Sequence, residues 1–114
     1  ILEKIPEYKL EYGTTLNNLV LPYKSTGERE KAKKCTEKAL EIFAETVGQE
    51  NSLYSAALNN LAIFFYEEKD YKTAEKLFGE SLIICEKTFG KNSINYKNLE
   101  ENLKIVQAKT GEES

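Results

Sequence analysis

The chain has 114 residues, of which 40% are hydrophobic and 31% are charged, and its formal net charge is −3. This composition is typical of a globular protein, and the length suits one domain or a short run of repeats. A mildly acidic chain is a poor match for a nucleic-acid backbone, which requires clustered Lys and Arg, and its apolar runs are too short to cross a bilayer. We therefore expect no nucleic acid and no membrane among its partners.

Residues 7–48 are predicted to form two helices, over about 10–25 and 29–46. The first helix contains Pro22, which removes a backbone hydrogen bond and should kink or loosen that helix. The second helix stops before Gly48, where a left-handed residue commonly ends a helix. These two helices form the first predicted unit.

Residues 49–90 repeat this arrangement. A first helix over about 51–66 carries an amphipathic stripe at spacings of three and four, formed by Leu58, Leu61, Ala62 and Phe65. A polar turn ends in Asp70, which is a common N-cap residue. A second helix over about 71–88 follows, and Gly90 is predicted to end it.

Residues 91–108 are predicted to form one more helix, followed by a polar tail at 109–114. Positions that are apolar in the earlier units become polar here, namely Glu100, Lys104 and Gln107, which suits a helix that caps a solenoid. The alternative is a truncated repeat, because Gly111 falls 84 residues after Gly27, where another second helix would begin. At the other end, residues 1–6 are predicted to be the tail of a preceding helix.

The informative feature is an internal repeat, since the sequence matches itself at a constant shift of 42 residues. The matches include Tyr12, Tyr54 and Tyr96; Asn18, Asn60 and Asn102; Leu19, Leu61 and Leu103; and the pairs Leu16/Leu58, Ala32/Ala74 and Gly48/Gly90. Two antiparallel helices cannot bury both of their apolar faces alone, so such units must stack. The predicted fold class is therefore all-α, an α-α superhelix built from antiparallel helix pairs.

These residues resemble the tetratricopeptide repeat, whose signature places apolar, small and aromatic residues at fixed positions on both helices. The second unit fits at every one of these positions, with Leu58, Leu61, Ala62, Phe65, Ala74 and Phe78. The first unit lacks the second aromatic, because Thr36 stands there. The period of 42 residues and the Leu-Asn-Asn-Leu segment are similar to the kinesin light chain class of these repeats. The resemblance covers about residues 7–108 and implies a module that binds an extended peptide or partner protein.

The resemblance also implies a binding site in a concave groove lined by the first helices. Family members use one Asn per unit to hold a peptide main chain, and this position falls on Asn18, Asn60 and Asn102. An amide can donate to and accept from a peptide unit; the alternative is that these residues tie adjacent helices together. An aliphatic stripe three residues further on could seat ligand side chains or belong to the core. The candidate groove residues are Asn17, Asn18, Leu21, Asn59, Asn60, Ile63, Tyr66, Asn98, Asn102 and Ile105. Such a groove is polar and nearly uncharged.

Several kinds of chemistry are not expected. The chain has no histidine and two cysteines, so it lacks the commonest general base and cannot complete a four-ligand zinc site alone. We expect no enzyme activity, no metal and no cofactor. Cys35 and Cys85 fall at apolar positions of the repeat, which favours buried thiols in a reducing, cytoplasmic setting. The basic run 29–34 is interleaved with Glu, so we expect a solvated helix face, and we expect Glu67 and Glu68 to be solvated as well.

Two other functions fit the same sequence. The solenoid could be a structural spacer or self-association element, in which apolar ends at Ile1–Ile5 and Leu103–Val106 stack on a second copy to form a homo-oligomer. It could also be the regulatory domain of a larger bacterial sensor protein. Peptide binding in the groove is the function that we favour.

Overall fold

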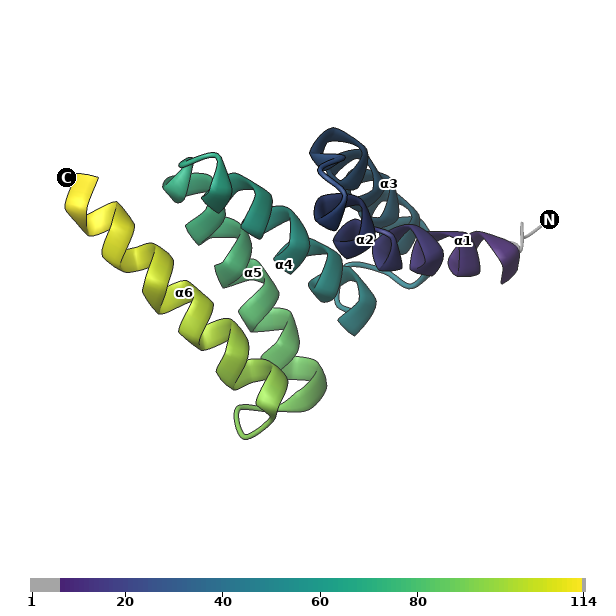
Figure 1. The fold of residues 1–114 in the computed structure, drawn as a ribbon. Coiled ribbons are helices and arrows are strands. Elements are labelled where there is room, and N and C mark those ends of the chain that lie inside the picture. The colour runs from purple at the N-terminus through teal and green to yellow at the C-terminus, as the bar shows by residue number, and fades with distance from the viewer. Residues whose placement is uncertain (1–6, 114) are drawn as a thin grey trace.

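The computed structural model describes residues 7–113, which form a stack of α-helices. In chain order these are α1 (Glu7–Asn18), α2 (Val20–Ser25), α3 (Arg29–Thr46), α4 (Ser52–Glu67), α5 (Tyr71–Phe89) and α6 (Ile94–Glu113). The helices α1 and α2 pack on α3, α3 packs on α4, α4 on α5, and α5 on α6, so the stack follows the chain (Figure 1). This arrangement confirms the predicted all-α superhelix. Within the described residues, no helix is both long and apolar enough to cross a membrane.

Asp70, Gly48 and Gly90 end or begin helices as the sequence predicted, and Asn51 is a further cap that the sequence analysis did not name. Asp70 caps α5, since its side chain accepts a hydrogen bond from the backbone N–H of Thr73 at 3.4 Å. Asn51 caps α4 in the same way, accepting from the N–H of Leu53 at 2.8 Å. Glycines with positive φ follow α2, α3 and α5, with φ of 81°, 89° and 85° at Gly27, Gly48 and Gly90, and after α4 the positive φ of 67° falls on Lys69. These positive angles favour glycine because it has no Cβ.

The predicted first helix is interrupted at Leu19, which separates α1 from α2. Leu19 keeps near-helical angles of φ −81° and ψ −10°, so the chain bends there without reversing. Pro22 explains the bend, because it has no N–H for the carbonyl of Asn18 and its ring crowds that carbonyl. The interruption places Pro22 in the first turn of α2, where an N–H has no helical partner in any case. The expected kink is therefore confirmed.

Small residues set the distance between the two helices of each pair. Ser55 on α4 and Ser81 on α5 are buried, their hydroxyl oxygens lie 2.8 Å apart, and each hydroxyl lies within 3.0 Å of the other residue's carbonyl oxygen. Gly13, 42 residues before Ser55, occupies the same place on α1, and a Cβ added there would lie 2.8 Å from Cγ2 of Ile42. Close helix contact therefore depends on small side chains at these positions.

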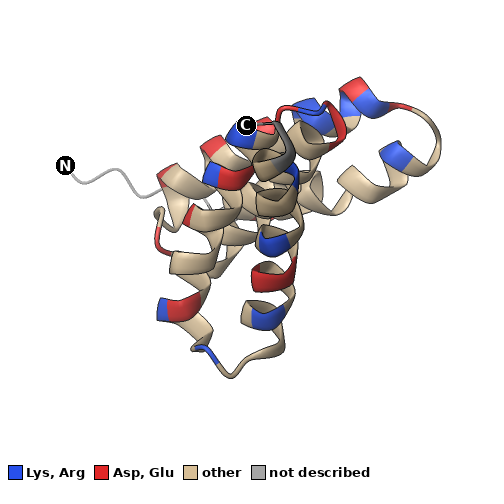
Figure 2. Ribbon diagram, turned by 90° about the vertical axis from the view of Figure 1, so that its left-hand side faces the viewer, with Lys and Arg blue, Asp and Glu red and all other residues tan. Residues whose placement is uncertain are grey.

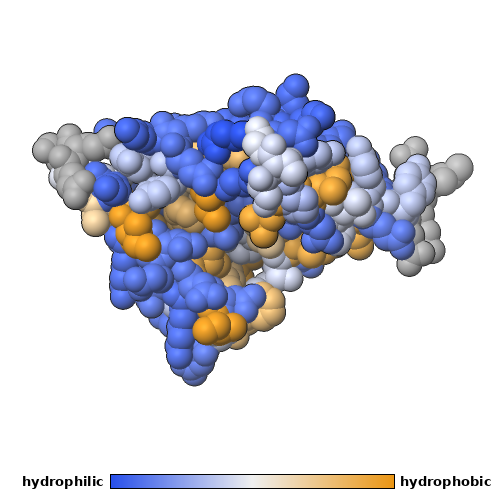
Figure 3. Space-filling view, viewed as in Figure 1, coloured by the Kyte–Doolittle hydropathy of each residue, from blue (hydrophilic) through white to orange (hydrophobic). Residues whose placement is uncertain are grey.

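The contact between the two repeats centres on Phe64. Its side chain is fully buried and packs with Val20 of α2 and Ala32 of α3. The sequence stripe on α4 included Phe65, which is only half-buried, and left Phe64 out. The reason is that α4 packs against helices on two sides, α3 and α5, so it has two apolar faces. Figure 3 shows that the apolar residues left at the surface form separate patches among hydrophilic ones.

Ion pairs join the first repeat to the end of α4. Arg29 pairs with Glu67 and Glu68, Lys24 pairs with Glu67, and Lys33 pairs with Glu68. We call these five side chains the inter-repeat clasp. Glu67 and Glu68 are exposed, as the sequence led us to expect. The ion pairs were not expected, because the stack brings together residues that are 35 to 43 positions apart in the chain. Elsewhere the basic and acidic residues are interleaved over the helices (Figure 2).

The last helix differs from the prediction in two ways. It runs to Glu113, so most of the predicted polar tail at 109–114 is helical. The reason is that Lys and Glu are good helix formers, and a single Gly lowers helix stability by only about 1 kcal/mol relative to Ala. Val106 is fully buried and Leu103 packs against the same core, whereas Ile105 is 46% exposed, so only part of the predicted apolar end at Leu103–Val106 lies at the surface. The prediction for residues 1–6, including Ile1–Ile5, lies outside the described residues.

Candidate peptide-binding groove

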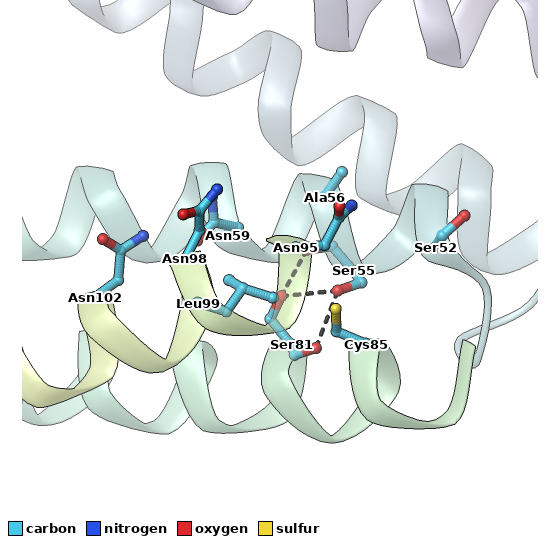
Figure 4. A pocket seen from close by; sticks show the side chains of 10 residues that line it. All are labelled: Ser52, Ser55, Ala56, Asn59, Ser81, Cys85, Asn95, Asn98, Leu99 and Asn102. Carbon is cyan, nitrogen blue, oxygen red and sulfur yellow. Dashed lines mark hydrogen bonds between the residues drawn. The ribbon is translucent and has the colours of Figure 1, made fainter. Parts of the chain in front are cut away.

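A groove lies between α4 and α6, and α5 forms its floor. It consists of two hollows that share Asn102. The first, which we call the polar hollow, has a volume of about 280 Å³ and is lined by Ser52, Ser55, Ala56, Asn59, Ser81, Cys85, Asn95, Asn98, Leu99 and Asn102. Figure 4 shows these side chains on α4, α5 and α6. The second, which we call the apolar hollow, has a volume of about 210 Å³ and is lined by Ile63, Tyr66, Phe78, Asn102 and Ile105.

Side-chain amides dominate the polar hollow. Asn95, Asn98 and Asn102 lie on α6 at spacings of three and four, which places them on one face of that helix. Asn59 lies across from them on α4. Its Oδ1 atom is the one buried side-chain oxygen or nitrogen without a hydrogen-bond partner in the described part of the chain. Buried polar atoms are normally hydrogen-bonded, so the Asn59 amide has an unmet acceptor, and the amide must rotate to turn this oxygen toward a donor in the hollow.

The floor of the polar hollow consists of neutral side chains. The Ser55 and Ser81 hydroxyls are occupied with each other and with backbone carbonyls. The Cys85 side chain is 2% exposed, and burial raises the pKa of its thiol, although a hydrogen bond with Ser93 opposes that rise. A thiol with a raised pKa is a poor nucleophile. This floor can support a ligand but offers no reactive group.

The apolar hollow has aliphatic and aromatic walls. Ile63 and Tyr66 on α4 and Ile105 on α6 form its sides, and Phe78 on α5 lies between them. The Tyr66 ring is held edge-to-face against Tyr71, with ring centroids 5.4 Å apart and planes at 60°. Aromatic pairs favour this geometry. The wall that Tyr66 forms is therefore held in place by packing against Tyr71.

Six of the ten sequence-predicted site residues meet in this groove: Asn59, Ile63, Tyr66, Asn98, Asn102 and Ile105. The other four lie elsewhere. Asn60 donates a hydrogen bond from Nδ2 to Oδ1 of Asn17 at 2.9 Å, which ties α4 to α1. Asn18 and Leu21 are exposed on the first repeat. The three repeated Asn residues therefore have different surroundings, and Asn102 is the one that lines the hollows.

The sequence reasoning missed four polar residues of the site: Ser52, Ser55, Ser81 and Asn95. Asn95 has no counterpart among the matches of the 42-residue repeat, which is why the repeat did not reveal it. Its spacing from Asn98 and Asn102 was the available signal, because positions three and four apart share a helix face. Among residues 7–113, no group of three or more His, Cys, Asp or Glu side chains could hold a metal ion.

A stack of antiparallel helix pairs with a groove between α4 and α6 defines an α-helical repeat protein. Residues 13–52 and residues 53–114 each match the tetratricopeptide repeat family. The second match alone covers more than half of the chain, so the protein belongs to the tetratricopeptide repeat family. A search of curated proteins found no match to the chain. Repeats of this family generally mediate protein–protein interactions, and a protein is therefore the kind of partner to consider.

Proposed function

We propose that the groove between α4 and α6 binds an extended peptide segment of a partner protein. The observation that carries this proposal is the polar hollow, in which amides from α4 and α6 face the same space and Oδ1 of Asn59 lacks a donor within the described residues. A peptide main chain offers one N–H donor and one C=O acceptor per residue. Amide side chains match both groups whatever the peptide sequence.

The dimensions support a short peptide. The groove extends along α4 from Ser52 to Tyr66, which is roughly 20 Å at 1.5 Å per helical residue. An extended chain covers that distance with about six residues. The polar hollow would hold main-chain groups, and the apolar hollow would take a side chain.

Asn60 has a different role in this proposal. Its amide nitrogen is engaged by Asn17, so it supports the contact between α1 and α4. Loss of one such hydrogen bond typically costs about 1 kcal/mol of stability. Asn60→Ala should therefore lower the unfolding midpoint, whereas Asn102→Ala should act on binding.

A test compares Asn102→Ala with Asn92→Ala on an array of immobilised nine-residue peptides. Asn92 is exposed in the turn between α5 and α6 and lines neither hollow. We expect Asn102→Ala to weaken binding of the selected peptides at least tenfold and to leave the circular dichroism spectrum unchanged. Asn92→Ala should bind as the parent protein does.

Equal binding by both variants would contradict the proposal. Sedimentation equilibrium over a range of concentrations addresses the self-association alternative. That alternative predicts concentration-dependent association that Asn102→Ala leaves intact. Within the apolar end that this alternative uses, Leu103 and Val106 pack against α5 and Ile105 remains exposed.

A further inference from the structure

We infer that the peptide segment recognised by the groove is uncharged and carries one bulky apolar side chain, which enters between the C-terminal halves of α4 and α6. The inference rests on the proposed function and adds the chemical class of the ligand. Three features of the groove lead to it: the absence of charged side chains from its walls, the size of the apolar hollow, and the distance between the two hollows.

Among the described residues, no charged side chain lines the groove. No Asp, Glu, Lys or Arg is among the residues that line the two hollows, and α4 has no charged residue before Glu67. A charged ligand group that entered would lose water without gaining a partner of opposite charge. That exchange is strongly unfavourable. The groove should therefore reject acidic and basic side chains alike.

The cations that the first repeat presents toward α4 do not change this conclusion. Lys24 and Arg29 are bound to Glu67, and Lys33 is bound to Glu68. Lys24 and Arg29 also lie over the ring of Phe64, each 4.9 Å from its centroid. An acidic peptide would have to compete with these partners, so the clasp does not act as an anion site.

The apolar hollow has room for one large side chain. Its volume is about 210 Å³, and an apolar cavity of about 150 Å³ is enough to hold a benzene molecule. Phe or Leu would bury its side chain against Ile63, Phe78 and Ile105. Burial of such a side chain is worth about 1.5–3 kcal/mol. A smaller residue such as Ala would leave most of the hollow unfilled.

The spacing of the two hollows fixes a register. Asn59 in the polar hollow and Tyr66 in the apolar hollow are seven residues apart on α4, which corresponds to about 10 Å along the helix axis. An extended peptide spans that distance with about three residues. The bulky side chain should therefore lie about three residues from the peptide unit held by Asn59, and the residues between them should be uncharged.

The test uses synthetic nine-residue peptides with blocked termini, built from Gly, Ser and Asn, with Phe or Leu at one position. Matched copies carry one Glu or one Lys within three residues of the bulky residue, on each side in turn. We expect the uncharged peptides to bind. The residues on one side of the bulky residue lie in the polar hollow. A single Glu or Lys on that side should weaken binding at least tenfold.

Protein variants assign the effect to the groove. A further set of peptides has Ala in place of Phe. Ile105→Ala should reduce the preference for the Phe peptides over these Ala peptides at least fivefold, because it removes one wall of the apolar hollow. Ile83→Ala is the matched control, since Ile83 is an exposed aliphatic residue of α5, 57% exposed, that lines neither hollow. Asn98→Lys should raise the binding of Glu peptides relative to uncharged ones. Asn98 is exposed, so the fold should tolerate this change.

The outcomes separate the inference from the proposed function. If Asn102→Ala and Ile105→Ala leave binding of every peptide unchanged, the groove is not the binding site and both proposals fail. If these variants weaken binding but Glu and Lys peptides bind as well as uncharged ones, peptide binding stands and the inferred ligand class is overturned. Weakened binding together with discrimination against charge supports both.

Discussion

Gly13 lies where α1 crosses α3, at a position that leaves no room for a methyl group. A Cβ added there would lie 2.8 Å from Cγ2 of Ile42 and 3.1 Å from Cε1 of Phe43. Both neighbours are buried in the core, so they cannot move aside without disturbing other contacts. Overpacking of this kind costs about 1–3 kcal/mol. We expect Gly13→Ala to lower the free energy of unfolding by about 2 kcal/mol, measured by urea denaturation.

Gly79 provides the matched control for this prediction. It lies inside α5, and a Cβ added there would meet no atom within 4 Å. Ala is favoured over Gly in a helix interior by about 1 kcal/mol, so Gly79→Ala should raise the stability. If both substitutions destabilise the protein equally, crowding at Gly13 is not the cause.

At the scale of the helix, the bend between α1 and α2 depends on Pro22. An Ala at this position would give an N–H to the carbonyl of Asn18 and remove the crowding by the ring. We expect Pro22→Ala to join α1 and α2 into one helix and to increase the helical signal in circular dichroism. The free energy of unfolding should change by less than about 1 kcal/mol, because the loss of proline also loosens the unfolded chain.

Backbone chemical shifts of Leu19 and its neighbours measure the bend directly. The control is Leu21→Ala, which changes an exposed residue of α2 and leaves the backbone donors as they are. A bend that persists in Pro22→Ala would mean that the burial of Val20 against Phe64 holds it, and the role given to proline would be wrong.

The helices show how far the sequence could predict the fold. The 42-residue repeat and the amphipathic stripes predicted α3 with the bounds that the structure shows, and α4 and α5 to within one residue. The burial of Phe64 could not be predicted in this way, because a single stripe accounts for one packed face and α4 has two. The clasp was missed because ion pairs between repeats depend on how the helices stack.

The groove was predictable only in part, for a related reason. The repeat placed Asn18, Asn60 and Asn102 at equivalent positions, but their surroundings depend on the neighbouring helix. Asn60 faces Asn17, which is close enough for a hydrogen bond, whereas Asn102 faces an open hollow. Equivalent sequence positions therefore do not guarantee equivalent contacts in a stack of finite length.

At the scale of the whole molecule, the inter-repeat clasp should make the stability depend on pH. Burial raises the pKa of Glu67, but hydrogen bonds from Arg29 and Lys24 outweigh it, so its pKa lies below the ordinary value of 4.5. A hydrogen bond from Lys33 has the same effect on the pKa of Glu68, against a smaller opposing effect of burial. The unfolded chain therefore binds these protons more readily than the folded one. The stabilisation is complete above the ordinary value and is lost as the pH falls through the lowered pKa.

Glu67→Gln tests this consequence, because it keeps the shape of the side chain and removes its charge. Partly exposed ion pairs contribute up to about 1 kcal/mol each. We therefore expect the variant to be less stable by about 1 kcal/mol at pH 7 and low salt, and the difference should shrink below about pH 4 as Glu67 becomes protonated in the parent protein. Thermal and urea unfolding of both proteins over this pH range measure it. High salt should reduce the difference at pH 7, since the charges remain partly open to solvent.

Glu101→Gln is the control, because Glu101 is exposed on α6 and forms no ion pair with any other described residue. It should leave the stability unchanged at every pH.

In a stack of repeats, each unit contacts only its neighbours, so stability includes a term for every interface between units. The clasp and Phe64 share one interface, and Glu67→Gln should therefore weaken the coupling of the first repeat to the second without altering the groove between α4 and α6. A pH-independent difference between Glu67→Gln and the parent protein would show that the charge of Glu67 does not hold the repeats together.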